Sequence, residues 1–196
     1  MSRVTAYAAT GAVPFDAAVV RGMRAGADWA WNTAWDELAP PLAAYVRSIG
    51  ADTVEAEDLV SEAITRLIAH RDRLPEAPGS VRAWAFAVAR NLFIDDRRSA
   101  RHRRTRTFDA HEHETRAIHV DAVDDSVAVV MAALDSLPGQ QRELIVLHVY
   151  GELTLREAAY VLGMSHAGAR KAYSRAAGRL RATIDISSRA RDTPIA

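Results

Sequence analysis

The sequence predicts an all-α protein made of two small helical domains, and three observations lead to this. Apolar residues recur at intervals of three and four along most of the chain, as on one face of an α-helix. No segment has the alternating apolar and polar pattern of a β-strand. A polar, acidic linker, residues 105–125, lacks helical periodicity and separates two sets of helices. We therefore expect helical domains at residues 15–104 and 126–182, between an N-terminal extension, 1–14, and a C-terminal tail, 183–196.

The composition limits the classes of protein to consider. The chain has 196 residues, 49% of them hydrophobic, which is enough to bury a core. It has no cysteine, so disulfides, thiolate catalysis and thiolate zinc sites are excluded. No apolar run is long enough to cross a membrane, and polar residues interrupt the N-terminal apolar stretch, which argues against a signal peptide. We expect a cytoplasmic protein that does not contact a membrane.

The charges are segregated along the chain, although they sum to zero. Residues 1–80 carry a net charge of −4, residues 81–106 of +6, residues 107–143 of −6 and residues 144–196 of +4. Two separate basic segments favour two contacts with a polyanion such as a nucleic acid. The acidic segments can then face a different partner.

The first domain begins with a helical region from Phe15 to Ile49. We expect an interruption near Pro40 and Pro41, because proline cannot donate a helical hydrogen bond, and a helix stop at Gly50. Large apolar side chains of this region are its candidate core: Trp29, Trp31, Trp35, Leu38, Leu42, Tyr45 and Val46.

A second helix, about Val54 to Arg71, is predicted to be amphipathic. Its apolar stripe consists of Leu59, Val60, Ala63, Ile64, Leu67 and Ile68. The side chains largely off that stripe give the helix an acidic outer face near its start: Glu57, Asp58, Ser61, Glu62 and Thr65.

A loop with two prolines and a glycine, Leu74 to Ser80, precedes a long helix, residues 81–106, that Ser80 can cap. One face of this helix carries Val81, Trp84, Ala85, Val88 and Leu92. A cluster of arginines follows that face: Arg97, Arg98, Arg101, Arg103, Arg104 and Arg106. Guanidinium groups suit bidentate contacts with phosphates, but a solvated basic helix end explains this segment by itself equally well.

The linker is rich in histidine as well as acidic residues, which raises the alternative of a metal site. The candidate ligands are His111, His113 and His119 with Glu112 or Glu114. Ligands at alternate positions of a segment without fixed structure do not converge on an ion, so a flexible linker is the preferred interpretation. We expect no catalytic residue, metal or cofactor in this chain.

The second domain is predicted to start with a helix from Ser126 to Pro138. Its apolar positions are Val127, Val130, Met131, Leu134 and Leu137. Another helix follows from about Gly139 to Tyr150, and Gly151 ends it.

Residues 154–180 are predicted to form a helix, a tight turn and a second helix. Thr154 and Glu157 have the spacing of a capping box, Gly163 can adopt the backbone angles of the turn, and Ser165 can cap the second helix. The first helix has an apolar face of Leu155, Ala158, Ala159, Val161 and Leu162. This arrangement is typical of a helix-turn-helix.

The second of these helices has two distinct faces. Its apolar stripe consists of Ala169, Ala172, Tyr173, Ala176 and Leu180. The opposite face carries Arg170, Lys171, Ser174 and Arg175. Their donors suit phosphates and base edges in a major groove, and the capping box and turn favour DNA recognition over a merely solvated basic helix.

These segments, in this order, resemble an extracytoplasmic-function (ECF) sigma factor of the bacterial sigma-70 family, over about Phe15 to Arg181. The segment EAEDLVSEAITRL, residues 55–67, is similar to region 2.2 of that family, and VRAWAFAVARNLFIDDRRSAR, residues 81–101, is similar to regions 2.3 and 2.4. The segment LDSLPGQQRELIVLHVYGELTLREAAYVLGMS, residues 134–165, is similar to region 4. The resemblance implies a sigma region 2 helical bundle and a sigma region 4 helix-turn-helix, with no enzymatic activity.

The resemblance also implies a subunit that directs core RNA polymerase to promoter DNA through the polymerase clamp helices and flap. The residues implied to contact the clamp helices are Asp58, Ser61, Glu62 and Arg66. The loop from Leu74 to Ser80 would meet the unpaired minus-ten strand, and the DNA contacts beside it would come from Asn91, Arg97, Arg98, Arg101, Arg103 and Arg104. The minus-thirty-five element would be read by Arg170, Lys171, Ser174 and Arg175. An anti-sigma factor is a further expected partner.

Two alternatives remain open at this point. A sigma-like module could bind an anti-sigma factor without initiating transcription, although it would not need both basic surfaces. A conventional operator-binding regulator would use only the C-terminal helix-turn-helix, and would not need Arg97, Arg98 and Arg101. An enzyme ranks third, because no catalytic constellation is evident.

Overall fold

The computed structural model describes residues 15–106 and 132–191, with side chains at 15–100 and 132–183. This part of the chain is built of helices and contains no strand, so the all-α prediction is confirmed. Its elements are α1 (Ala17–Ala25), α2 (Asp28–Ser48), α3 (Thr53–Ala69), the short 3₁₀ helix η3 (Arg71–Arg73), α4 (Pro78–Arg106), α6 (Gly139–Val149), α7 (Leu155–Val161) and α8 (His166–Arg191).

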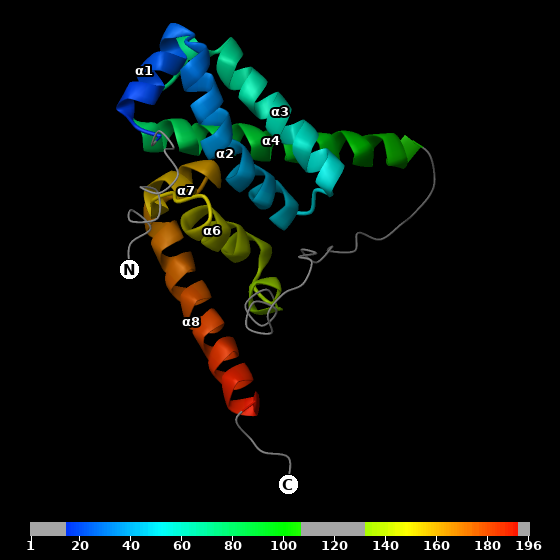
Figure 1. Cartoon of the computed structure of the whole chain (residues 1–196). Helices are drawn as coiled ribbons and strands as arrows, with labels where there is room; N and C mark the ends of the chain where they lie inside the picture. The colour runs from blue at the N-terminus through cyan, green and yellow to red at the C-terminus, as the bar shows by residue number, and fades with distance from the viewer. Residues whose placement is uncertain (1–14, 107–131, 192–196) are drawn as a thin grey trace.

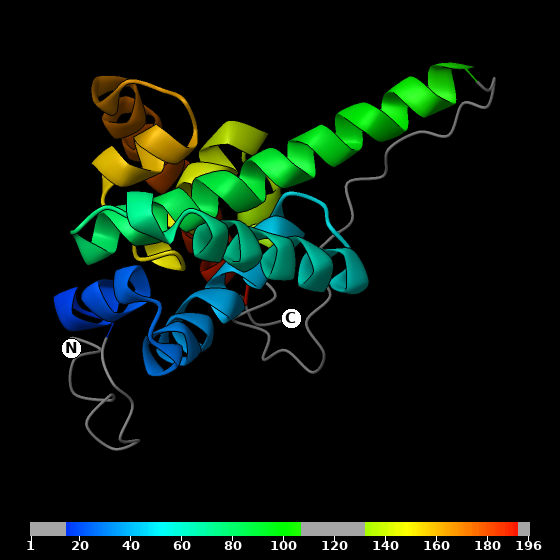
Figure 2. The same cartoon turned by 90° about the horizontal axis from the view of Figure 1, so that it is seen from above.

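Helix α4 lies at the centre of the molecule. It packs on α2 and α3 of the N-terminal group and on α7 of the C-terminal group (Figure 1). Viewed from above, its C-terminal half extends well past the other helices (Figure 2). Helix α8 extends away from the rest of the molecule toward the C-terminus.

The two groups of helices share a hydrophobic core. Buried residues of α1 to α4 form one continuous cluster with buried residues of the C-terminal group, which include Leu144, Leu147, Leu153, Ala158 and Ala169. A second, smaller cluster lies within the C-terminal group and contains Leu134, Leu137, Ile145 and Ala176. The N-terminal part of α4 is therefore covered by both groups.

The interruption expected near Pro40 and Pro41 is wrong. Helix α2 continues through both prolines, and the chain breaks instead after α1, where Gly26 adopts a left-handed conformation with φ of 76°. Leu38 and Leu42, on either side of the prolines, are fully buried. Their packing holds the two turns in place and outweighs the missing backbone hydrogen bonds, although proline in a helix interior costs about 3 kcal/mol.

The buried face of α2 differs from the predicted core. Leu38, Leu42, Tyr45 and Val46 are buried as expected, and Trp31 packs at the edge of the core. Trp29 and Trp35 are 51% and 44% exposed, so their assignment to the core is wrong. The positions that face the core are Ala30 and Ala34, and at Ala30 the close approach of Gly22 of α1 leaves room only for a small side chain.

Helix α3 begins with a capping box in which the Asp52 carboxylate accepts a hydrogen bond from the Glu55 N–H at 2.9 Å. Its predicted outer face is exposed, and its predicted stripe is buried except for Ile68, which is 41% exposed. The assignment of Ile68 to the core is therefore wrong. It lies in the last turn of α3, beyond the buried Leu67.

Helix α4 starts at Pro78, not after Ser80, so the predicted cap at Ser80 is wrong. The N–H groups of Ser80 and Val81 donate to the carbonyl oxygen of Ala77 at 3.0 and 3.1 Å, which places Ser80 within the first turn. Proline is favoured at a first helical position, because its missing N–H has no partner there anyway.

The C-terminal half of α4 is attached to α3 by Arg97. Its guanidinium donates to the Glu55 carboxylate at 2.7 Å and to the Gly50 carbonyl oxygen at 2.8 Å, and lies 4.8 Å from the centre of the Phe93 ring. Arg97 thus joins α4 to the loop and the cap that start α3. These contacts place a predicted DNA-binding residue in a structural role.

The C-terminal group follows the predicted order of helices. Residues 132–135 are helical, and α6 and α7 match the predictions to within a residue or two. Leu134 and Leu137 are buried, while Val127, Val130 and Met131, with most of the predicted linker, lie outside the described residues. Among the described helices, none combines the length and apolar character that a membrane span requires.

We predict that Gly22→Ala destabilises the protein. A Cβ atom at Gly22 would lie 2.6 Å from the Cβ of Ala30 and 2.8 Å from the Trp29 ring, so α1 and α2 would have to separate. The free energy of unfolding, measured by urea denaturation, should fall by about 1–3 kcal/mol. Gly178→Ala is the matched control, because nothing lies within 4 Å of that site, and it should be neutral or stabilising by up to about 1 kcal/mol. Equal stabilities of the two variants would contradict the close packing of α1 on α2.

We also predict that Arg97→Ala destabilises the protein whereas Arg98→Ala does not. The Arg97→Ala variant loses one hydrogen bond to the Glu55 carboxylate and one to the Gly50 carbonyl oxygen. At this half-exposed position their loss should lower the free energy of unfolding by about 1–2 kcal/mol. Arg98 is exposed and lies 3.9 Å from Asp95, so its removal should leave the urea midpoint unchanged. An Arg97→Ala variant with the same urea midpoint as the wild type would contradict a structural role for Arg97.

Candidate nucleic-acid interface and acidic groove

The helix-turn-helix has the capping geometry that the sequence predicts. The Thr154 N–H donates to Glu157 Oε2 at 2.8 Å, and the Glu157 N–H donates to Thr154 Oγ1 at 3.3 Å. These reciprocal bonds fix the first turn of α7. Gly163 has φ of 64°, and the Gly168 N–H donates to Ser165 Oγ at 3.1 Å, so both the turn and the cap of α8 are confirmed.

Helix α8 separates its buried and exposed faces sharply. Ala169 and Ala176 are fully buried, and Ala172 and Tyr173 pack beside the core. The exposed face carries the four predicted recognition residues, Arg170, Lys171, Ser174 and Arg175. A helix whose small residues lie against its partner and whose donors face outward can enter a major groove.

His148 supports the inner face of α8, a contact that the sequence did not indicate. Its Nδ1 lies 2.7 Å from the carbonyl oxygen of Leu153, a hydrogen bond in which the ring nitrogen is the donor. Its ring meets the Tyr173 ring edge to face, with 4.9 Å between the ring centres. His148 comes from α6, so this pair ties α6, the segment before α7 and α8 together.

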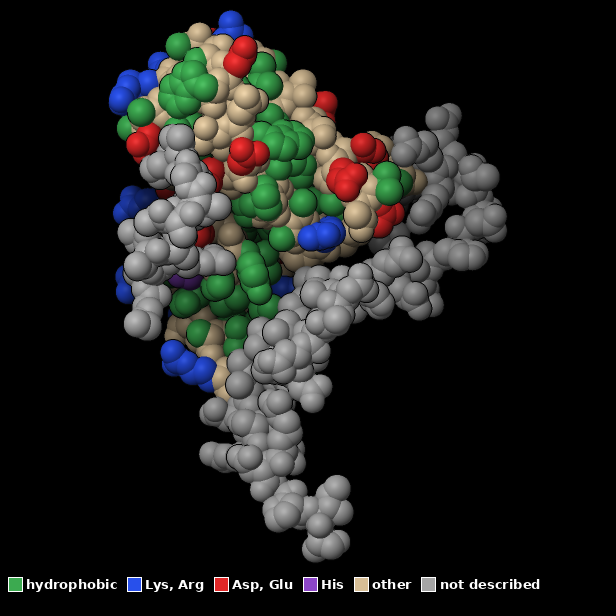
Figure 3. All heavy atoms as spheres, viewed as in Figure 1, with side chains coloured by type: hydrophobic (Ala, Val, Ile, Leu, Met, Phe, Trp, Pro, Cys, Tyr) green, Lys and Arg blue, Asp and Glu red, His purple; other side chains and the backbone are tan. Residues whose placement is uncertain are grey.

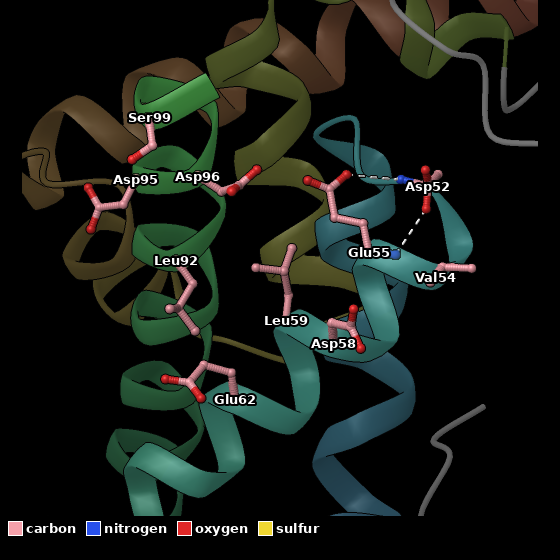
Figure 4. Close-up of a pocket in the computed structure, with 10 residues that line it drawn as sticks. All are labelled: Asp52, Val54, Glu55, Asp58, Leu59, Glu62, Leu92, Asp95, Asp96 and Ser99. Atoms are coloured by element: carbon pink, nitrogen blue, oxygen red, sulfur yellow. Dashed lines mark hydrogen bonds between the residues drawn. The ribbon is translucent and has the colours of Figure 1, made fainter. Parts of the chain in front are cut away.

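An acidic groove of about 640 Å³ runs between α3 and the C-terminal half of α4 (Figure 4). Its apolar lining consists of Val54, Leu59 and Leu92. Carboxylates surround this lining from both helices: Asp52, Glu55, Asp58 and Glu62 from the α3 side, and Asp95 and Asp96 from α4, beside Ser99. Acidic side chains gather on the surface over the N-terminal part of α3 and the adjacent part of α4 (Figure 3). An apolar floor between carboxylates suits a basic, amphipathic helix of another protein.

The four predicted polymerase-contact residues are only partly brought together. Asp58 and Glu62 line the groove. Ser61 is exposed on the same helix but outside the lining, and Arg66 is paired with Glu62 at 2.7 Å. Arg66 therefore partly neutralises one carboxylate at the edge of the groove.

Asp95 and Asp96 are groove residues that the sequence prediction did not include. They follow Leu92 by three and four positions, so helical spacing places all three on one side of α4. That spacing was the available signal. Without the position of α3, however, it does not indicate that the aspartates face an acidic partner helix.

The predicted minus-ten residues are described only in part. Asn91 and Arg98 are exposed, and Arg97 is engaged with Glu55. The side chains of Arg101, Arg103 and Arg104 lie outside the described residues, as does the histidine cluster of the linker. The loop before α4 is held by Arg24, which donates to the Leu74 carbonyl oxygen at 3.1 Å. No group of three or more potential metal ligands occurs within the part of the chain that the structure describes.

Comparison with known proteins identifies both groups of helices. The family model described as Sigma-70 region 2 matches residues 34–103, and the one described as Sigma-70, region 4 matches residues 128–180. These ranges cover α4 as far as residue 103 and the helix-turn-helix, and thus most of both predicted DNA-binding surfaces.

Individual relatives agree with these matches. The ECF RNA polymerase sigma factor SigF of Caulobacter vibrioides is 35% identical over 134 residues, which cover 67% of this chain and 72% of SigF. SigL of Mycobacterium tuberculosis, also an ECF sigma factor, is 36% identical over 94 residues, so the match spans about half of each protein, 48% of this chain and 47% of SigL.

A solved structure shows the same fold. It is that of the sigma factor RpoE from Bartonella quintana in complex with the anti-sigma factor NepR, and it matches with a TM-score of 0.60 and 22% identity over 79% of this chain and 96% of RpoE. With both regions present in order and with SigF similar over most of its length, the chain belongs to the sigma-70 family, in the group of ECF RNA polymerase sigma factors.

Proposed function

We propose that this chain is a dissociable specificity subunit of RNA polymerase, which binds the core enzyme and directs it to promoters through minus-ten and minus-thirty-five contacts. The observation that carries the proposal is the presence of two oppositely charged surfaces on one chain. The acidic groove between α3 and α4 suits a protein partner, and the basic face of α8 suits DNA. A conventional operator-binding regulator needs only the second surface.

The acidic groove is the proposed docking site for the polymerase clamp helices. Asp58 and Glu62 offer carboxylates to basic side chains, and Leu59 and Leu92 offer an apolar surface between them. Arg97 supports this groove indirectly, since it fixes the Glu55 carboxylate at the groove's edge. Charged groups at such a surface accelerate association and select the partner, while the apolar floor adds affinity.

The projecting half of α4 is the proposed contact with minus-ten DNA. Asn91 and Arg98 are exposed there, and Arg101, Arg103 and Arg104 continue the same helix. Together with the loop before α4, these residues would hold bases of the unpaired strand. Each captured base offsets part of the unstacking cost of a few kcal/mol, so a duplex can open without ATP.

An anti-sigma factor is the proposed regulatory partner, and the cytoplasm is the proposed site of action. The support for the partner is the fold shared with RpoE, which was solved bound to NepR. A basic or amphipathic segment that occupied the acidic groove would compete directly with the polymerase.

We predict that Asp58→Lys weakens binding to core RNA polymerase. Reversing the charge in the groove places a cation against the basic partner, and the affinity measured by fluorescence anisotropy should fall about tenfold or more. Promoter-dependent transcripts formed with core polymerase should decrease in parallel when the chain is limiting.

The matched control is Glu57→Lys, which makes the same change on the same helix but outside the groove lining. It should leave polymerase affinity within about twofold of wild type. The absence of any promoter-dependent transcript with the wild-type chain would overturn the proposed function. Equal losses for the two variants would overturn the assignment of the groove.

We predict that Arg175→Ala changes which minus-thirty-five sequences are bound. Core polymerase bound to each variant would select DNA duplexes from a pool with random minus-thirty-five sequences. The enriched sequences would then be compared between the variants. A side chain that contacts a base edge contributes about 1–3 kcal/mol of discrimination, so preference should be lost at one or two positions only.

Arg179→Ala is the control for this selection, because it also removes an arginine from α8. Arg179 lies 3.5 Å from Gln141 of α6 and is not one of the predicted recognition residues. It should retain the wild-type motif. An unchanged motif for Arg175→Ala would contradict base contact by this residue.

A further inference from the structure

A group of basic side chains lies near the N-terminal end of α4, where two segments far apart in the sequence meet. Helix α1 packs there on the short helix η3. Lys and Arg side chains gather on the surface over α1 and the neighbouring end of α3 (Figure 3). Four exposed arginines of these two elements form what we call the α1–η3 basic patch: Arg21 and Arg24 of α1, and Arg71 and Arg73 of η3.

The patch is attached to the loop that precedes α4. The Arg24 guanidinium donates to the Leu74 carbonyl oxygen at 3.1 Å, and the Leu74 side chain is buried in the core. The Arg71 side chain lies against the end of α1, since a Cβ atom at Gly26 would be 3.5 Å from its Nε. The patch and the start of the loop therefore form one continuous surface.

Carboxylates neutralise the patch only in part. Arg24 lies 3.9 Å from Glu76 and Arg73 lies 4.0 Å from Asp72, but these carboxylates are 92% and 76% exposed. Ion pairs as exposed as these contribute little. Within residues 15–100 and 132–183, the other two arginines of the patch form no ion pair. Gathering like charges in this way costs free energy unless an anion binds among them.

An exposed tryptophan lies beside the patch. Trp29, in the first turn of α2, is 51% exposed. Its ring lies against Gly22 of α1, the residue that follows Arg21. Proteins bind single-stranded nucleic acid by this combination, because cations hold the phosphates and an aromatic ring stacks on a base. A merely solvated basic surface would have no use for the exposed indole.

The position of the patch suits a strand that leaves the loop before α4. Helix α1 and the projecting half of α4 lie at opposite ends of α4 (Figures 1 and 2). A strand that runs from the projecting half to the loop from Leu74 to Ser80 therefore reaches α1 next. With nine residues, α1 is about 14 Å long, and about four nucleotides span that length at roughly 3.4 Å each.

We propose that the α1–η3 basic patch and Trp29 bind the unpaired DNA strand where it continues beyond the minus-ten loop. The arginines hold backbone phosphates and the Trp29 ring stacks on a base, so the contact does not depend on the base sequence. The inference rests on the proposed function. It adds a contact in residues 1–80, whose net charge of −4 gives no indication of a DNA-binding surface.

These contacts form only after the duplex has opened, because the strand is unpaired only then. A contact that is made in one of two states shifts the equilibrium toward that state. The patch therefore stabilises the open complex of polymerase and promoter relative to the closed one.

Fork-shaped promoter DNA tests this proposal. A promoter that the wild type transcribes would be prepared as a duplex that becomes single-stranded at the minus-ten element. In a short fork the unpaired strand ends with the minus-ten bases, and in a long fork it continues for about six nucleotides, enough to cross α1. Fluorescence anisotropy would measure the affinity of core polymerase bound to the chain at several salt concentrations. The wild type should bind the long fork about tenfold or more tightly than the short one.

The variants separate phosphate contacts from base stacking. Arg21→Gln and Arg71→Gln should each lower the affinity for the long fork about two- to fivefold. Each should also reduce the slope of log affinity against log salt by about 0.7, the contribution of one phosphate of a single strand. Trp29→Leu should lower the affinity for the long fork about fivefold or more without changing this slope, because stacking releases no counterions. Far-ultraviolet circular dichroism would check that each variant is folded.

Arg47→Gln is the matched control, because Arg47 is an exposed arginine in the last turn of α2, at the opposite end of that helix from Trp29. It should keep the wild-type gain in affinity from the longer strand. Equal wild-type affinities for both forks, or an undiminished gain in the three variants, would overturn the proposal and leave the proposed function intact. Equal losses on both forks would assign the patch to duplex DNA and would also overturn it. If no promoter is transcribed, the proposed function fails, and this proposal fails with it.

Discussion

The burial of α4 between two groups of helices is the constraint on which the rest of the structure depends. Its N-terminal part is covered around its circumference, since none of the residues from Val81 to Arg90 is exposed. Phe86 reaches both Tyr45 of the N-terminal domain and the chain beside Gly151 of the C-terminal domain. A helix fixed in this way can extend its C-terminal half into solvent without losing its orientation.

The segregation of charge along the sequence becomes a segregation of surfaces in space. The acidic segment of α3 and the aspartates of α4 meet in one groove, and the basic residues of α8 occupy a separate face. Charge is also used in the contact between the two domains, where Glu143 of α6 accepts hydrogen bonds from Arg90 of α4 and Tyr45 of α2.

Several features could be predicted from the sequence because they depend on neighbours in the chain. The capping box of Thr154 and Glu157, the turn at Gly163 and the two faces of α8 all follow from spacing and backbone preference. The interruption expected near Pro40 was wrong because tertiary packing decides there. Burial of Leu38 and Leu42 in the core outweighs the local preference of proline. The tryptophans of α2 were misplaced because the buried face of this helix carries Ala30 and Ala34, with Ala30 close to Gly22 of α1.

The sequence alone determined most of the helices, their order, the acidic outer face of α3 and the basic face of α8, because periodicity and capping act over a few residues. Only the tertiary structure decided that Asp95 and Asp96 complete the acidic groove, that Arg97 is bound by Glu55, and that Glu143 joins Arg90 and Tyr45. Those pairs are separated by some 30 to 100 positions in the chain. Their meeting is fixed by how whole helices pack, which no local pattern encodes.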